Sequence, residues 1–206
     1  LPICINIHSR GEKQMLTNEQ VLDILKEKDA VLEGHFLLTS GRHSDRYVQC
    51  AKLFQYADTS AKICESLAEG LKDMDIDAVV SPAVGGILMG YEMGRQLGVR
   101  NIFTERVEGK MALRRGFTVA QGEKLLVVED VVTTGGSVKE VIALMRELGA
   151  EIVGVASVVD RSAGKVDFGV PYKAALSMEV VSFEPEECEL CKVGSKPVKP
   201  GSRNIK

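Results

Sequence analysis

The stretch from Val127 to Ser137, VVEDVVTTGGS, decides the fold class of this chain. Together with the two leucines before it, its first residues form a short apolar run that suits a strand buried on both faces. Two carboxylates, Glu129 and Asp130, follow where that strand should end. A turn rich in Thr and Gly then leads into a predicted helix over 138–148. The stretch therefore indicates a strand–turn–helix unit of an α/β protein.

The same stretch combines two features that suit a sugar phosphate. Ligands of open α/β sheets bind at the carboxyl ends of the strands, where the two acids are expected to lie. The glycines allow close approach of the backbone, and its amides, with the hydroxyls of Thr133, Thr134 and Ser137, can hold an anion. Neither GxxxxGK[ST] nor GxGxxG occurs in the chain. A plain strand-to-helix turn with solvated acids is the alternative interpretation.

The chain around this unit alternates between short apolar runs and helical patterns. Strands are predicted over 78–81, 102–104, 125–128 and 152–159, and helices over 85–97 and 138–148, which Gly98 and Gly149 should end. Strands that are apolar on both faces, alternating with helices, predict a parallel sheet covered by helices. One α/β domain is the simplest organisation.

A small appendage precedes this domain. Thr17 and Gln20 fit a capping box, and the pattern predicts a helix over 18–33 closed by Gly34. Two short strands over 35–44 and 47–50 should follow around a Ser-Gly turn, and then a helix capped by Asp58. Residues 1–14 lack such a pattern; we expect them to be extraneous or upstream sequence, with a genuine N-terminal arm as the alternative.

Composition narrows the class of protein. The 206 residues are 45% hydrophobic and 27% charged, as in ordinary globular proteins. A net charge of −3 and a pI near 5.7 argue against a generic nucleic-acid binder. No apolar run approaches the length of a membrane span. The five cysteines are scattered and no signal peptide precedes them, so we expect a reducing, cytoplasmic compartment.

Several stretches resemble one family. VVEDVVTTGGS resembles the signature with which type I phosphoribosyltransferases bind phosphoribosyl diphosphate (PRPP). Residues 36–44, FLLTSGRHS, with Tyr47, are similar to the N-terminal hood of the branch that uses orotate. Residues 106–116, RVEGKMALRRG, resemble its mobile catalytic loop, and Arg161 follows a strand where that branch places an arginine near the orotate carboxylate. The resemblance implies the type I phosphoribosyltransferase fold, a mostly parallel central sheet flanked by helices, with a small N-terminal hood.

The resemblance also implies how the chain is divided. It runs from about Met15 to the C-terminus and implies a single phosphoribosyltransferase domain over 15–206. Within it the hood spans about 15–55, the PRPP-binding core about 56–185 and a C-terminal tail 186–206.

The implied reaction transfers the phosphoribosyl group from PRPP to orotate, giving orotidine 5′-monophosphate and pyrophosphate in pyrimidine biosynthesis. Mg²⁺ would be carried by the diphosphate and ribose and not bound directly by the protein. The implied partners are the two substrates and a second copy of the chain in a homodimer, with no nucleic acid and no membrane. A purine phosphoribosyltransferase, or a PRPP-sensing regulator of the same fold, is the alternative.

The resemblance assigns roles to individual residues. The implied catalytic residues are Lys110 and Arg106, which would close over the departing pyrophosphate. The implied PRPP-binding residues are Glu129, Asp130, Val131, Val132, Thr133, Thr134, Gly135, Gly136, Ser137, Gly85 and Gly86. The implied orotate-binding residues are Thr133, Arg161 and Tyr47.

The chain departs from the family pattern at cationic positions. Many members have a lysine where this chain has Thr39, and another in the pyrophosphate loop near Gly85. The stretch after Arg106 lacks a histidine that some members have, but offers Arg114 and Arg115.

Cys188 and Cys191 have zinc-knuckle spacing in the tail. A zinc site needs four ligands, the chain has no second CxxC, and its only histidines are His8, His35 and His43. We therefore expect packed or surface thiols, with a reversible disulfide or a metal between subunits as the alternatives.

Overall fold

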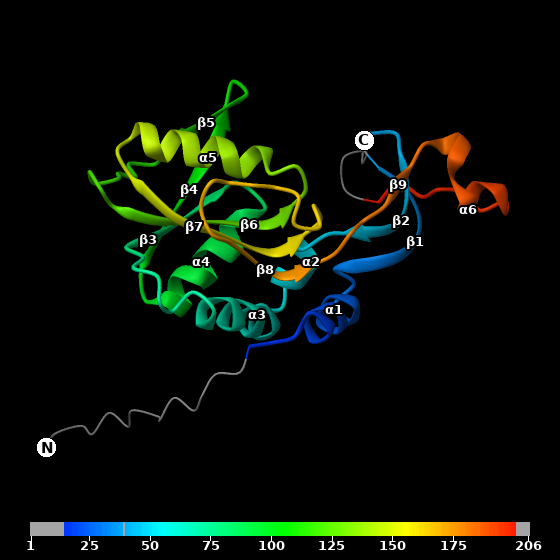
Figure 1. The fold of residues 1–206 in the computed structure, drawn as a ribbon, viewed down its shortest axis with the longest axis horizontal. Coiled ribbons are helices and arrows are strands. Elements are labelled where there is room, and N and C mark those ends of the chain that lie inside the picture. The colour runs from blue at the N-terminus through cyan, green and yellow to red at the C-terminus, as the bar shows by residue number, and fades with distance from the viewer. Residues whose placement is uncertain (1–14, 39, 201–206) are drawn as a thin grey trace, which may run out of the picture.

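The computed structural model describes residues 15–38 and 40–200, so residues 1–14 and Thr39 lie outside the described part of the chain. Two sheets and the helices packed on them make up the molecule (Figure 1). The helices are α1 (Asn18–Glu27), α2 (Ala51–Phe54), α3 (Ala57–Glu69), α4 (Gly86–Leu97), α5 (Gly136–Glu147) and α6 (Glu189–Lys192), with a 3₁₀ turn η1 (Pro185–Glu187). The strands are β1 (Val31–Leu37), β2 (His43–Val48), β3 (Ala78–Pro82), β4 (Arg100–Val107), β5 (Lys110–Leu113), β6 (Lys124–Val132), β7 (Glu151–Asp160), β8 (Tyr172–Ser177) and β9 (Ser182–Phe183).

The larger sheet has six strands in the order β5-β4-β3-β6-β7-β8. All neighbours pair in parallel except β5, which is antiparallel to β4 at the edge. Helices α3 and α4 cover one face and α5 covers the other (Figure 1). The predicted α/β class, with a mostly parallel sheet flanked by helices, is confirmed.

Strand β6 shows why this sheet needs helices on both faces. Leu126 and Val128 pack in the cluster with α3 and α4, whereas Leu125 and Val127 pack in the cluster with α5. All four are fully buried. Because successive side chains of a strand point to opposite faces, a strand between two helical layers is apolar at every position.

The strand order contains a topological switch point between β3 and β6. The chain passes from β3 outward to β4 on one side, and from β6 outward to β7 on the other. Ligands of such sheets bind in the crevice at the carboxyl ends of the two strands on either side of that point. The loops that follow Pro82 and Val132 therefore mark the expected site.

A smaller sheet, β1-β2-β9, lies at one end of the molecule and is called the hood here (Figure 1). Strands β1 and β2 form an antiparallel hairpin, and β9 adds to β2 from the C-terminal part of the chain. The tail continues through η1 and α6, and Val198 then bridges to Phe36 of β1. The hood thus contains segments from both ends of the described chain.

The helix predicted over 18–33 extends too far at its C-terminal end. The capping box of Thr17 and Gln20 is present, but α1 stops at Glu27 and residues 31–37 form β1. Asp29 adopts a left-handed φ of 52°, and the amide of Ala30 donates to the carbonyl of Leu25 over 2.8 Å. These are the features of a Schellman-type stop, which here is made without glycine. Because α1 ends early, the two hood strands have other bounds than predicted, 31–37 and 43–48. The predicted hairpin around the Ser-Gly turn is confirmed.

Two other local predictions need correction. Asp58 lies in the first turn of α3, whose N-cap is Tyr56 and carries no side-chain hydrogen bond. The stretch over 106–116, for which the sequence indicates no strand, contains the turn and second strand of the β4–β5 hairpin, in which Glu108 and Gly109 both have positive φ. Paired positive φ values suit a tight hairpin turn.

The predicted helices over 85–97 and 138–148 are confirmed to within about two residues, with Gly98 in the left-handed conformation after the first. Among the described residues, no helix combines the length and the apolar character that a membrane span requires.

Candidate active site

The acid pair stands at the carboxyl end of β6, as the sequence predicts. Glu129 and Asp130 are both half-buried. Asp130 Oδ1 accepts from the amide of Val131 over 2.9 Å. Burial raises the pKa of Glu129 well above its usual value, and the adjacent Asp130 carboxylate raises it further. Two acids held this close are poised to accept hydrogen bonds from a ligand, because donors would relieve both their desolvation and their repulsion.

The loop after β6 forms the cradle that the sequence predicts. Gly135 has a φ of 73°, and a Cβ there would come within 2.7 Å of Val166 Cγ1, so only glycine fits. Helix α5 begins at the next residue without a side-chain cap, which leaves its first amides available to an anion. Residues 131–138 and Glu129 line one small cavity here, in which Thr133 and Thr134 are exposed.

The loop after β3 closes on the acid pair from the other side of the switch point. A Cβ added to Gly85 would lie 2.9 Å from Asp130 Oδ1, and one added to Gly86 would lie 3.3 Å from Glu129 Oε1. The Ala83–Val84 peptide bond in this loop is cis. The structure therefore brings together the glycines and acids that the resemblance assigns to PRPP.

Arg161 extends this site toward the hood. Its amide donates to the carbonyl of Val132 over 2.8 Å, which places it beside the end of β6. Its Nε atom is buried and has no hydrogen-bond partner among the described residues. Burial lowers the pKa of Arg161, and the nearby Tyr47 of the hood opposes that shift. A half-buried guanidinium whose Nε donor is buried and unpaired suits an anion, because leaving that donor unpaired costs free energy.

Asp160 holds the turn that presents Arg161. Its carboxylate accepts from the amides of Ser162 and Gly164 over 2.8 and 3.0 Å and from the Ser177 hydroxyl over 3.3 Å. Only 3% of Asp160 is exposed. It is therefore a positioning residue that fixes the backbone on the far side of Arg161.

The two residues expected to be catalytic lie apart from this group. Arg106 pairs with Glu140 of α5, with Nη1 2.7 Å from Oε2, and also donates to the carbonyl of Gly109. Lys110 is exposed at the start of β5. Neither lines the cavity beside the acid pair. The structure thus places both cations on the hairpin at the edge of the sheet.

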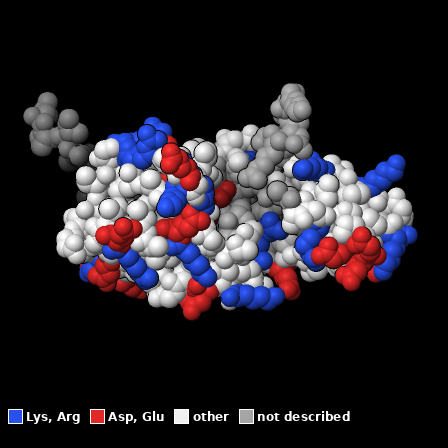
Figure 2. Space-filling view, turned by 90° about the horizontal axis from the view of Figure 1, so that it is seen from above, with Lys and Arg blue, Asp and Glu red and all other residues white. Residues whose placement is uncertain are grey.

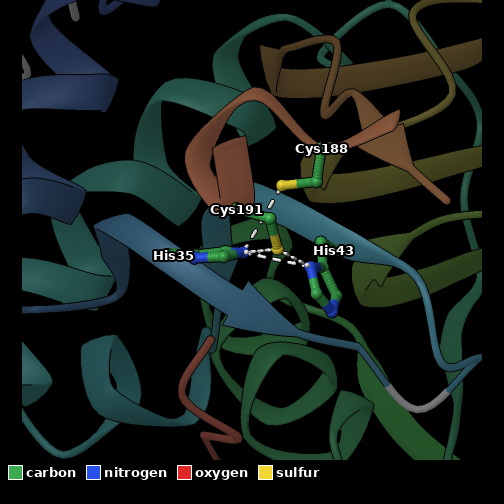
Figure 3. Close-up of side chains that lie close together, drawn as sticks. All are labelled: His35, His43, Cys188 and Cys191. Carbon is green, nitrogen blue, oxygen red and sulfur yellow. Dashed lines mark hydrogen bonds between the residues drawn. The ribbon is translucent and has the colours of Figure 1, made fainter. Parts of the chain in front are cut away.

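Sequence reasoning missed a second group of polar side chains. His35 and His43 of the hood lie beside Cys188 and Cys191, and their four ligand-type atoms are within 4.8 Å of one another (Figure 3). The CxxC spacing was the available signal. It could not be completed from the sequence, because the histidines are about 150 positions away and only the pairing of β9 with β2 brings the tail to them.

Comparison with known proteins agrees with this geometry. A family model described as the phosphoribosyl transferase domain matches residues 54–172. The crystal structure of a phosphoribosyltransferase from Corynebacterium diphtheriae superposes with a TM-score of 0.63 at 32% identity, covering 78% of this chain and 95% of that one. The orotate phosphoribosyltransferase of Aeropyrum pernix, at 24% identity and a TM-score of 0.65, covers 77% of this chain and 93% of its own and shows the shared fold. The fold and the site define a type I phosphoribosyltransferase.

The relatives in sequence narrow the class. The orotate phosphoribosyltransferase of Caldanaerobacter subterraneus subsp. tengcongensis is 54% identical over 92% of this chain and all of its own length. That of Heliobacterium modesticaldum is 57% identical over 91% of this chain and likewise all of its own length. The chain belongs to the orotate phosphoribosyltransferase family.

Proposed function

We propose that this protein transfers the phosphoribosyl group of PRPP to N1 of orotate, with release of pyrophosphate, in pyrimidine biosynthesis. The observation that carries the proposal is the pairing of two complementary sites at one sheet edge. An acid pair with an anion cradle lies at the switch point, and the half-buried Arg161 lies beside it, with Tyr47 of the hood nearby. The first site suits a ribose phosphate, and the second suits a planar base that carries a carboxylate.

The PRPP site follows from the chemistry of its parts. Glu129 and Asp130 accept hydrogen bonds from the ribose 2′- and 3′-hydroxyls, and residues 131–137 hold the 5′-phosphate through the amides at the start of α5. The hydroxyls of Thr133, Thr134 and Ser137 add donors. Gly85 and Gly86 approach the acids closely enough for their backbone to contact the diphosphate.

Orotate binds with its carboxylate on Arg161 and its ring between Tyr47 and Thr133. Tyr47 is half-buried, and its ring centroid lies 5.8 Å from that of Phe36 with the ring planes tilted by 42°. Orotate is already anionic, so its nitrogen needs no strong general base. This agrees with a site built of acids, hydroxyls and a cation.

Departure of pyrophosphate leaves positive charge on the ribose and adds negative charge to the leaving group. Cations that meet that negative charge lower the barrier, and exclusion of water protects the ribosyl cation. Lys110 and Arg106 supply those cations when their hairpin closes over a site. Arg106 must then exchange Glu140 for the pyrophosphate. Further neutralisation of this charge would come from Mg²⁺ carried by the diphosphate and ribose, whose oxygens are ligands that Mg²⁺ prefers.

A homodimer is part of this proposal. Val84, Leu88 and Tyr91 are 83%, 53% and 65% exposed and follow one another at helical spacing along α4 and the loop before it. An exposed apolar stripe of this kind favours burial against a second copy of the chain. The four described cysteines are free thiols, which supports a cytoplasmic location.

The test is an absorbance assay of the purified protein with PRPP and Mg²⁺, offering orotate, adenine and hypoxanthine in parallel. We expect orotate to be consumed and both purines to be left. Consumption of a purine with orotate untouched would keep the fold and overturn the role of Arg161, since a purine carries no carboxylate. PRPP binding without consumption of any base would favour a sensor. Mixed positive and negative charge on the face seen in Figure 2 offers such a sensor no basic surface for nucleic acid.

A further inference from the structure

The hood contains a buried cluster of four side chains that the transfer reaction does not use. His35 of β1 and His43 of β2 point toward Cys188 and Cys191 of the tail (Figure 3). The exposed fractions of His35, His43 and Cys188 are 7%, 6% and 1%, and Cys191 is half-buried. We propose that these residues form a structural Zn²⁺ site that fastens the C-terminal tail to the hood.

Four of the six distances between these atoms are close to the edges of a zinc tetrahedron. With Zn–N near 2.0 Å and Zn–S near 2.3 Å, a tetrahedral site has edges of about 3.3 Å between nitrogens and about 3.6 Å between nitrogen and sulfur. His35 Nε2 lies 3.0 Å from His43 Nδ1 and 3.4 and 3.8 Å from the sulfurs of Cys188 and Cys191. The sulfur of Cys191 lies 3.3 Å from His43 Nδ1. Four of the six distances are thus near those of a zinc tetrahedron, and all four atoms lie within 4.8 Å of one another.

The cluster converges on one ring nitrogen more closely than hydrogen bonding among the side chains requires. His35 Nε2 carries one hydrogen or one lone pair, yet three polar atoms converge on it. One hydrogen bond can use that atom, and Cys191 Sγ can pair with His43 Nδ1 over 3.3 Å, so hydrogen bonds do not need three polar atoms around one ring nitrogen. A metal ion satisfies all of them at once. Two thiolates, two neutral imidazoles and Zn²⁺ also sum to zero charge, which burial tolerates.

The surroundings of His35 suit the tautomer that a metal requires. Its other ring nitrogen, Nδ1, lies 3.2 Å from the hydroxyl of Ser195, which can accept a hydrogen bond from it. That bond leaves the lone pair of Nε2 directed at the cluster. Metal-bound histidines commonly make such an outer hydrogen bond, which fixes the ring and raises its basicity. Ser195 comes from the same tail as the cysteines, so the outer contact also joins tail and hood.

The backbone brings the ligands together from both ends of the chain. The β1–β2 pairing shifts register between Glu33 and Phe36, a bulge that contains His35. His43 pairs with Phe183 of β9, and the chain then turns through η1 to deliver Cys188. After Cys191 the tail returns along β1, where Val198 exchanges hydrogen bonds with His35 and Leu37.

The outer hood needs such a fastening. Neither of the two hydrophobic clusters in the described chain includes Phe36, His35, His43 or Cys188, although all four are buried. Small units without enough apolar core are commonly stabilised by a metal or by disulfides. Cys188 and Cys191 are free thiols, so the metal is the choice that this geometry supports.

Metal analysis of the full-length protein, purified from zinc-supplemented medium without chelator, tests the site. We expect about one Zn²⁺ per chain, which is lost when Cys191 is replaced by Ser and retained when Cys191 is replaced by His, another zinc ligand. The matched control is Cys64→Ala, which removes a buried thiol from α3 and should keep the zinc. Zinc far below one per chain in the wild type would overturn the proposal, as would a Cys188–Cys191 disulfide in that preparation.

A spectroscopic measurement avoids reliance on variants that fold poorly. Chelator-treated wild type, titrated with Co²⁺, should show the visible bands of a tetrahedral thiolate site, and Zn²⁺ should displace them. Removal of the metal should lower the melting temperature, and Zn²⁺ should restore it. Absence of the cobalt bands would contradict the site, as would a melting temperature that changes with neither chelator nor Zn²⁺. None of these readouts needs substrate, so they stand apart from the proposed reaction.

Discussion

Glu129 illustrates how a single carboxyl can cost stability where function needs it. Its pKa in the folded chain is raised by burial and by Asp130, so folding favours its protonated form. Such a group costs nothing below its unfolded pKa of about 4.3. The cost grows as pH rises through the interval up to the raised value, because the unfolded chain ionises more readily.

Replacement of Glu129 by Gln should therefore stabilise the free protein at neutral and alkaline pH. The melting temperature of Glu129→Gln should exceed that of the wild type at pH 8, and the difference should vanish toward pH 4. Each 1 kcal/mol of relieved penalty raises the melting temperature of a chain this size by about 2–4 °C. Calorimetry of both proteins at several pH values measures this difference in melting temperature.

Glu140→Gln is the control variant, because its effect on the stability of the fold should have the opposite sign to that of Glu129→Gln. The Arg106 guanidinium lowers the pKa of Glu140, so that carboxylate stabilises the fold above its unfolded pKa and loses this effect as pH falls. This variant should be less stable than the wild type near pH 7 and equal to it at low pH. An equal response of the two variants to pH would contradict the assigned environments.

At the scale of the element, the β4–β5 hairpin separates what sequence can predict from what it cannot. The basic stretch was recognised, and its residues were assigned to the departing pyrophosphate. Its pairing was not predicted, because a short edge strand of mixed polarity such as KMAL lacks the apolar run that marks buried strands. Arg106 is also held by Glu140, a contact between positions 34 apart that no local pattern reveals.

Lys110 gives the hairpin a testable role. We expect Lys110→Ala to lower kcat by about 100-fold, the scale for losing one charged donor in the transition state. The KM for orotate should change little, since Lys110 is assigned to the leaving group. Lys72→Ala, which removes an exposed lysine that pairs with Glu69 at the end of α3, is the matched control and should leave kcat unchanged. Steady-state kinetics in which both variants behave alike would refute this assignment.

The core elements around the site were predictable for a physical reason. A strand between two helical layers is apolar on both faces along its buried part. Short apolar runs in the sequence therefore mark β3, β6 and β7. The acid pair and the glycine turn follow such a strand and are local in sequence. The hood was less predictable, because its third strand and its histidine–cysteine cluster depend on pairing between the two ends of the chain.

At the scale of the whole molecule, the exposed stripe on α4 links assembly to the site. Helix α4 starts at the loop that contacts the acid pair, so a partner covering Leu88 and Tyr91 would also steady that loop. Burying such side chains gains roughly 25 cal/mol per Å² of apolar surface, whereas a charge placed there would oppose it.

Tyr91→Asp should therefore shift the protein from dimer to monomer in light scattering and reduce its activity. Leu148→Asp introduces the same charge at another exposed apolar position, 43% exposed at the end of α5, and should remain dimeric. A monomeric wild type, or a dimeric Tyr91→Asp variant, would place the interface elsewhere or remove it.

The central claim is that orotate is held by Arg161 while PRPP is held at the end of β6. The most direct test compares the two KM values of Arg161→Met with those of the wild type. A hydrogen bond to a charged group contributes about 1.5–3 kcal/mol, so the KM for orotate should rise by about 10- to 100-fold. The KM for PRPP should stay within a factor of about two. An unchanged KM for orotate, or an equal rise in both, would contradict the division of the site.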